Sequence, residues 1–251
     1  MPEYFTQAGL EPYQLMAMAL CALLVGMSKT GVAGVHYLVV PLMARVFEAR
    51  MSTGVLLPML IMGDVLAVWY YRREAAWHYI WRLIPWTLAG VVLGTLIGGA
   101  ISPEAFRGTV AVLVLGGIAV MVWLELHPER HIPDSAVFAG AIGLLGGITT
   151  MIGNMAGPVM TVYFLSMRLP KNAFIGTGAW FFLLVNVSKI PFQFFGWGTL
   201  SPSLLVVDLA MMPVIIAGAA AGFWIVKHIP EQEYRRFVIG VTVLSALMLF
   251  I

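Results

Sequence analysis

Apolar stretches long enough to cross a lipid bilayer recur along most of this chain. A helix rises about 1.5 Å per residue, so roughly 20 apolar residues span the hydrocarbon layer. Segments of that length are residues 51–71, 79–101, 104–124, 173–195, 203–226 and 232–251. Only 10% of the 251 residues are charged, which is too few to cover a water-soluble surface. The sequence therefore predicts an all-α polytopic membrane protein.

Two further apolar regions are too long for one crossing and are interrupted by polar, glycine-containing stretches. Residues 12–46 contain GMSKTGVAG (26–34), and residues 134–168 contain GGITTMIGNMAGP (146–158). Each region predicts two short helices joined by a break. A helix of about 16 residues rises only about 24 Å. Each pair is therefore interpreted either as short tilted crossings or as a re-entrant hairpin.

The second half of the chain repeats features of the first half in the same order. The aligned features are Gly26 with Gly147, Gly63–Asp64 with Val185–Asn186, residues 85–94 with 213–222, and residues 102–107 with 229–235. Single matches between apolar segments arise by chance, but a collinear set indicates an internal repeat. We expect a first repeat at residues 1–126 and a second at residues 127–251, which together form a single transport domain.

Each repeat then has about five helical segments, of which the first two are the broken or re-entrant pair. An odd number of segments inverts the second repeat, and the positive-inside rule tests this arrangement. With both termini outside, the cytoplasmic loops hold most of the basic residues: Arg72, Arg73, Arg82, Arg130, Arg168, Lys171, Lys227, Arg235 and Arg236. The outer loops hold Arg45, Arg50 and Arg107. This distribution favours inverted-topology repeats over parallel ones, in which each broken region would cross once.

Inverted repeats with breaks in matching positions are typical of secondary transporters, whose breaks line a substrate site near the bilayer midplane. A helix that restarts near Gly31, or near Pro158 in the second half, would present free N–H groups to an anion. Nearby hydroxyl, amide and lysine side chains would add donors and positive charge. The predicted substrate-binding residues are Ser28, Lys29, Thr30, Gly31, Thr149, Thr150, Asn154, Asn186 and Lys189.

Several of these polar residues also have structural interpretations. Lys29 can extend toward lipid headgroups, and the hydroxyls of residues 149–150 can bond to local carbonyls. Asp64 is a candidate for coupling transport to protons, but it can equally be a structural partner. Lys189 can neutralise an anion in transit, pair with Asp64 or reach toward headgroups. His36 is interpreted as a hydrogen-bonded structural residue.

Composition and motifs exclude several classes of function. The net charge of +2 and the lack of a basic run disfavour nucleic acid as a partner. The single Cys21 excludes a disulfide or a cysteine metal site within one chain. Signatures of metalloproteases, α/β-hydrolases and P-loop enzymes are missing, so neither an enzyme nor a cofactor is expected. The N-terminus lacks the basic region of a signal peptide, so the first apolar segment is expected to remain in the mature protein.

Four stretches of the sequence resemble the TauE/SafE sulfite exporter family, also called the toluenesulfonate uptake permease family. They are VVPLM (39–43), GGITTMIGNMAGPVM (146–160), GTGAWFFLLVNVSKIPF (176–192) and IAGAAAGFWIVKHIPEQEYRRF (216–237). The resemblance implies a carrier of sulfite, sulfonates or related organosulfur acids, driven by a proton or ion gradient. Both breaks carry fewer glycines than is usual in the family, and the added lysine and asparagine would alter the choice of anion.

The function predicted is therefore secondary transport of a small sulfur-containing oxyanion, coupled to protons or another ion, with alternating access between the two repeats. The expected location is the inner or plasma membrane, with membrane lipid as a partner and a homodimer as an open option. Two alternatives remain: an anion channel, and a subunit of a membrane assembly without transport activity.

Overall fold

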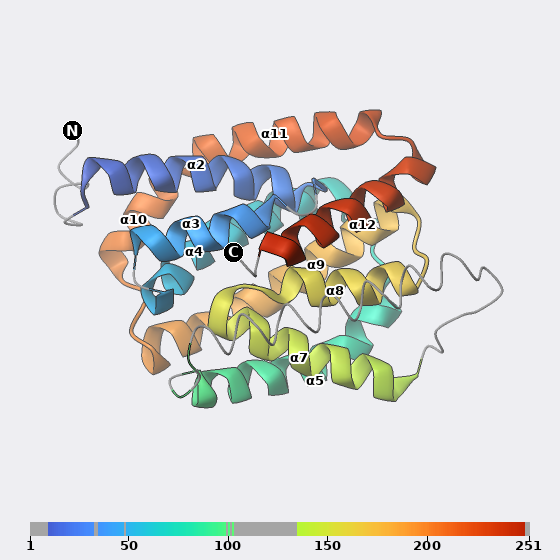
Figure 1. Ribbon diagram of the computed structural model, residues 1–251, viewed down its shortest axis with the longest axis horizontal. Coiled ribbons are helices and arrows are strands. Elements are labelled where there is room, and N and C mark those ends of the chain that lie inside the picture. Colours follow the sequence, from blue (N-terminus) through green and yellow to red (C-terminus); the bar gives the residue numbers. More distant parts are fainter. Residues whose placement is uncertain are drawn as a thin grey trace.

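The computed structural model describes residues 10–248, except 33–34, 48, 99, 101 and 103–134 (Figure 1). Among these residues every regular element is a helix, so the predicted all-helical fold is confirmed. The first half contains α2 (Pro12–Lys29), α3 (His36–Val46), α4 (Ala49–Tyr71) and α5 (Trp77–Ile97). The second half contains α7 (Ala136–Gly153), α8 (Ala156–Ser166), α9 (Lys171–Pro191), η1 (Phe192–Gly196), α10 (Pro202–Ala210), α11 (Met212–His228) and α12 (Glu231–Met248). The predicted segment 104–124 lies outside the described residues.

Several of the predicted membrane spans are present as long apolar helices. Four helices in the described part of the chain are long and apolar enough to cross a bilayer: Arg50–Tyr71, Trp77–Ile97, Ala136–Gly153 and Lys171–Gly196. The pair α10–α11 forms a fifth candidate but bends by 48°. The expectation of one continuous helix over residues 203–226 was therefore wrong. Pro213 lies in the first turn of α11 and cannot donate to a carbonyl of α10.

Both predicted breaks occur, but they lie nearer the C-terminal ends of the predicted stretches. Helix α2 continues through Ser28 to Lys29, and α3 begins only at His36, so the expected restart near Gly31 was wrong. Gly31 has a φ of 118°, a conformation that glycine alone adopts easily and that ends the helix here. Ser28 and Lys29 thus belong to the carbonyl end of a helix, where a positive charge is favourable.

The second break is only two residues long. Helix α7 ends at Gly153 because Asn154 adopts the left-handed conformation, with a φ of 55°, and its N–H bonds to the carbonyl of Thr150 at 3.0 Å. Helix α8 then starts at Ala156, two residues before the predicted start at Pro158. The close spacing brings the end of α7 and the start of α8 to one point in the interior.

Two pairs of helices pack closely along opposite edges of the molecule: α2 with α11, and α5 with α7 (Figure 1). A Cβ atom added to Gly218 of α11 would lie 2.1 Å from the carbonyl oxygen of Leu23 in α2. A Cβ atom added to Gly90 of α5 would lie 2.2 Å from the carbonyl oxygen of Leu144 in α7. Only glycine permits backbones to approach so closely.

The partner helices, α2 and α7, also carry a glycine at each of these contacts. A Cβ atom on Gly26 of α2 would lie 2.2 Å from the carbonyl oxygen of Ile215, and one on Gly147 of α7 would lie 2.1 Å from that of Thr87. The positions that sequence comparison aligned between the halves therefore occupy matching places in two similar helix pairs.

Helices α4 and α9 pack against each other in antiparallel orientation. Near the end of α9 and η1, Gln193 Nε2 donates to Thr53 Oγ1 at the start of α4, at 3.1 Å. At the other end, Gly176 near the start of α9 lies against the carbonyl of Tyr71 at the end of α4. This central pair joins the two halves of the chain.

Loops that carry many of the basic residues gather at one end of the helices. The N–H of Ala76, after α4, donates to Thr177 Oγ1 in the first turns of α9, at 2.9 Å. The N–H of Lys171 donates to Glu231 Oε1 at the start of α12, at 2.5 Å. The loops before α5, α9 and α12 therefore share one end of the molecule, as the positive-inside distribution requires.

Replacing Gly90 or Gly218 by alanine should lower the melting temperature of the purified protein by several degrees. The added methyl group would overlap a backbone carbonyl, and such overpacking costs about 1–3 kcal/mol. Gly240→Ala is the matched control, because nothing lies within 4 Å of its Cβ position, and alanine is the better helix former. Equal melting temperatures for Gly90→Ala and Gly240→Ala would contradict the close backbone packing.

Candidate substrate-binding site

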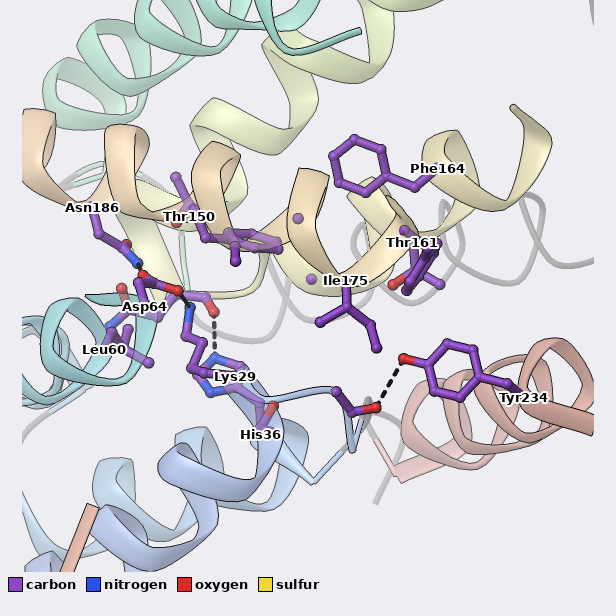
Figure 2. Close-up of a pocket in the computed structure, with 18 residues that line it drawn as sticks. Lys29, His36, Leu60, Asp64, Thr150, Thr161, Phe164, Ile175, Asn186 and Tyr234 are labelled. Atoms are coloured by element: carbon purple, nitrogen blue, oxygen red, sulfur yellow. Dashed lines mark hydrogen bonds and ion pairs between the residues drawn. The ribbon is translucent and has the colours of Figure 1, made fainter. Parts of the chain in front are cut away.

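A pocket of about 110 Å³ lies where the two broken regions meet (Figure 2). This volume is several times the roughly 10–15 Å³ that one water molecule needs, so the pocket can admit a small molecule. Its polar lining comes from both halves of the chain and consists of Ser28, Lys29, His36, Asp64, Thr150, Asn154, Thr161, Asn186 and Tyr234. Phe164, Phe174, Ile175 and Phe182 supply apolar walls.

Lys29, in the last turn of α2, forms a buried ion pair with Asp64 of α4. Its Nζ lies 2.8 Å from Asp64 Oδ1, and the two side chains are 12% and 0% exposed. The same Nζ lies 4.7 Å from the ring centroid of Phe182, close enough for a cation–π interaction. Lys29 therefore faces the pocket and does not extend toward the headgroups.

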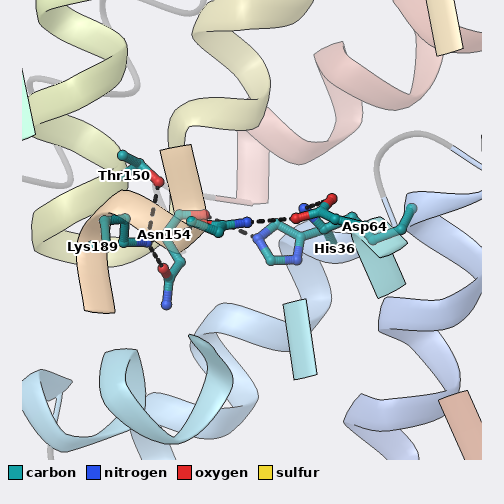
Figure 3. A network of polar contacts seen from close by, with 7 residues as sticks. His36, Asp64, Thr150, Asn154 and Lys189 are labelled. Atoms are coloured by element: carbon teal, nitrogen blue, oxygen red, sulfur yellow. Dashed lines mark hydrogen bonds and ion pairs between the residues drawn. The ribbon is translucent and has the colours of Figure 1, made fainter. Parts of the chain in front are cut away.

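Asp64 is connected to a second lysine through the amide of Asn186. Asn186 Nδ2 donates to Asp64 Oδ2 at 2.7 Å, while its Oδ1 accepts from Lys189 Nζ at 3.4 Å. Lys189 also donates to Asn154 Oδ1 at 2.5 Å and to Thr150 Oγ1 at 3.3 Å (Figure 3). This chain of contacts sets two lysines against one carboxylate, so its net charge is positive when all three groups are ionised.

Asn154, in the second break, connects the two breaks by hydrogen bonds. Its carbonyl oxygen lies 2.9 Å from Nε2 of His36, the first residue of α3, and its side-chain amide donates to the carbonyl of Thr53 at 3.2 Å. A residue in the left-handed conformation directs its carbonyl away from the helix it ends, which leaves this oxygen free to bond across the interior. His36 thus has the structural hydrogen bond expected of it, and it also lines the pocket.

The structure brings most of the predicted residues together, but not all of them. Those that line the pocket are Ser28, Lys29, Gly31, Asp64, Thr150, Asn154 and Asn186. Thr30 Oγ1 instead lies 2.9 Å from the carbonyl of Gly26. Thr149 bonds to the carbonyl of Leu145 at 2.9 Å, which is the local role considered as its alternative. Lys189 is fully buried and connects with the pocket through the side chains it bonds.

Sequence reasoning missed two polar residues at the other end of the pocket. Tyr234 of α12 donates its hydroxyl to the carbonyl of Gly31 at 2.9 Å, and Thr161 of α8 lies near it (Figure 2). Neither residue stands out in its segment, because a single tyrosine or threonine near a helix end is ordinary. Only the packing of α8 and α12 around the first break brings them to the pocket.

This arrangement suits a small anion. The ammonium group of Lys29 and hydroxyl groups from both halves of the chain line a cavity with aromatic walls. Charge-assisted hydrogen bonds from an ammonium group hold oxyanions strongly. Across the described residues no group of three or more His, Cys, Asp or Glu side chains could hold a metal ion.

Helices that are long and apolar enough to span a bilayer surround an internal, charged pocket, which is the general plan of membrane transport proteins. The chain belongs to the sulfite exporter TauE/SafE family, whose model matches residues 18–249. This match confirms the resemblance seen in the sequence. No curated protein and no solved structure matches the chain. The family indicates membrane export of sulfite or a related sulfur anion, and a transporter family is consistent with a protein that is not an enzyme.

Lys29→Met should destabilise the protein by about 3–5 kcal/mol, because it leaves Asp64 buried without its cation. In the double variant Lys29→Met, Asp64→Asn, the uncompensated charge is gone and the amide can still bond to Asn186. The loss in the double variant should therefore be smaller than the sum of the single losses by about 1–3 kcal/mol. The free energy of unfolding, determined in detergent for the wild type and all three variants, measures these losses. Additive losses would show that the two side chains do not interact as an ion pair.

Proposed function

We propose that the protein is a secondary transporter that carries sulfite, or a closely related sulfur oxyanion, out of the cell across the cell membrane. The observation that carries this proposal is the position of Lys29, which faces a small pocket between the two broken regions. The oxyanion would accept hydrogen bonds from Lys29 Nζ and from the hydroxyl of Ser28, which both line this pocket. An anion leaves water only where donors and positive charge replace its hydration.

The two halves, residues 1–126 and 127–251, act in this proposal as inverted repeats. Support comes from the equivalent glycine contacts in the pairs α2–α11 and α7–α5. The equivalent helices α4 and α9 run antiparallel, which is the relation between matching segments of inverted halves. Asp64 and Asn186 occupy aligned positions and bond to each other at 2.7 Å, as residues on an internal two-fold axis would.

Alternating access follows from this arrangement, because a site between two halves is exposed to either side when one half rocks against the other. The basic loops at the ends of α4 and α11 would face the cytoplasm. A carrier is favoured over a channel because the polar residues beyond the pocket bond to one another. Thr53, for example, bonds to Asn154 through its carbonyl and to Gln193 through its hydroxyl.

Asp64 is the proposed coupling residue. Charged or titratable groups near it are Lys29 on α2 and Lys189 on α9, with His36 of α3 in the same pocket. A proton on Asp64 would neutralise the carboxylate and release Lys29 Nζ from its ion pair to bind the anion. Return of the anion to water would let the ion pair form again, so protonation of Asp64 and occupation of the site by the anion would be linked.

Lys29→Gln should weaken sulfite binding at least tenfold, equivalent to about 1.4 kcal/mol, because Lys29 supplies the charge that faces the pocket. Titration calorimetry on purified protein measures the affinity. Lys227→Gln is the control, because this exposed lysine at the end of α11 lies outside the pocket and should bind like the wild type. Unchanged affinity in Lys29→Gln would remove Lys29 from the site.

Asp64→Asn should abolish the effect of a proton gradient on sulfite transport, while sulfite exchange without a gradient continues. Transport of labelled sulfite in proteoliposomes, with and without an imposed pH difference, measures both activities. Asp208→Asn is the matched control, since Asp208 is a buried carboxylate of α10 outside the pocket. An Asp64→Asn variant that still accumulates sulfite under a proton gradient would reject the coupling role, and a wild type that never accumulates sulfite would favour a channel.

A further inference from the structure

A second cavity, of about 650 Å³, adjoins the pocket at the end of the molecule where the basic loops gather. Phe174 of α9 and Tyr234 of α12 line both cavities, so these two side chains stand between them. The charged lining of this second cavity, here called the vestibule, consists of Arg168, Lys171, Glu231, Glu233, Arg235 and Arg236.

The separation between the two cavities depends on few contacts. Tyr234 is only 3% exposed, and its hydroxyl bonds to the carbonyl of Gly31 at 2.9 Å. Its ring lies 6.0 Å from the ring of Phe174, nearly edge to face. Figure 2 shows Tyr234 at one end of the pocket and the Lys29–Asp64 pair at the other. The partition is held by this one neutral hydrogen bond and by aromatic contacts, which also include Phe164 with Phe174 and Phe237 with Tyr234.

A group of buried polar side chains lies beyond Asn154, away from Tyr234. Asn154 donates to the carbonyl of Thr53, Thr53 bonds to Gln193, and Gln193 accepts from Thr199. All four residues are buried, and they come from three separate parts of the chain. Movement in that direction requires several hydrogen bonds to break together, whereas movement toward the vestibule requires one.

The vestibule carries more basic than acidic side chains, so its field attracts anions. Two of its cations are held by backbone carbonyls: Lys171 Nζ donates to the carbonyl of Ile229 at 2.7 Å, and Arg235 Nη1 donates to the carbonyl of Leu165 at 3.2 Å. Arg236 is 77% exposed and lies 3.4 Å from Glu233. An anion drawn into this cavity meets Tyr234 and Phe174 before it reaches the pocket.

We propose that Tyr234 and Phe174 form the gate between the vestibule and the pocket, and that the hydrogen bond from Tyr234 to Gly31 holds this gate closed. The gate passes a small oxyanion between the basic loops and Lys29. The identity of the anion rests on the proposed function, but the gate itself can be tested without sulfite.

Ser28 lines the pocket and supplies the reporter position. In a Cys21→Ala background, Ser28→Cys should react with a small, negatively charged methanethiosulfonate reagent only after the reagent has passed the gate. Adding Tyr234→Phe keeps the ring but removes its hydrogen bond. The labelling rate should then rise about fivefold, the factor that one neutral hydrogen bond represents. An unchanged labelling rate would overturn the gate.

Two controls separate gating from general loosening. Tyr70→Phe, at an exposed tyrosine outside both cavities, should leave the labelling rate unchanged. The native Cys21 is fully buried in α2, and it should remain unlabelled when Tyr234→Phe is the only substitution. Labelling of Cys21 in that variant would mean that the protein has loosened as a whole, and the gate would be rejected.

The same reporter tests the vestibule and keeps the two proposals apart. Arg236→Gln should slow labelling of Ser28→Cys by the anionic reagent but not by a neutral one of similar size. Equal effects on both reagents would reject the vestibule as the route. Sulfite binding is measured separately by titration calorimetry on Tyr234→Phe, which keeps Ser28. Faster labelling of Ser28→Cys when Tyr234→Phe is added, with no sulfite binding by Tyr234→Phe or by the wild type, would support the gate and refute the proposed substrate.

Discussion

A charge inside a membrane protein persists only where another charge or several hydrogen bonds compensate it. The contacts among Lys29, Asp64, Asn186 and Lys189 meet this requirement and connect three helices. The bond from Lys189 to Asn154 adds α7 and the second break. The helix ends, the left-handed Asn154 and the central α4–α9 pair are all arranged around these contacts. Removing one charged partner would leave the other exposed to a low-dielectric interior, so the polar centre and the fold depend on each other.

The sequence predicted the parts of the fold that depend on length and composition. Helices α4, α5 and α9 were found because about 20 apolar residues in a row have few other solutions in lipid. The helix end at Lys29 was placed too early, because serine, lysine and threonine in a row resemble a loop, although a helix tolerates them when they bond to its carbonyls or to a buried partner. The bend between α10 and α11 was missed because a proline in an apolar run does not by itself show that a helix bends. Pro213 lies in the first turn of α11, but Pro85, with which it is aligned, lies within a continuous helix.

The site was predicted in part for a related reason. Lys29, Asp64, Asn186 and Lys189 stood out because a polar side chain in an apolar run needs a local explanation, and their contacts now supply one. Tyr234 carried no such signal. Its hydroxyl matters only because α12 packs against the first break, and that contact joins residues 203 positions apart. Such long-range contacts are decided by the packing of many helices and leave no local pattern in the chain.

One consequence follows from the contact between Asp64 and Asn186, which occupy aligned positions in the two halves. A complex of two identical chains with this architecture would bring two copies of the same side chain face to face. Two carboxylates at that separation would repel each other unless they shared a proton. Two amides could bond to each other but would offer no negative charge to a lysine. A single polypeptide can place an acid on one side and its amide analogue on the other, and so keep one negative charge where symmetry would allow two or none.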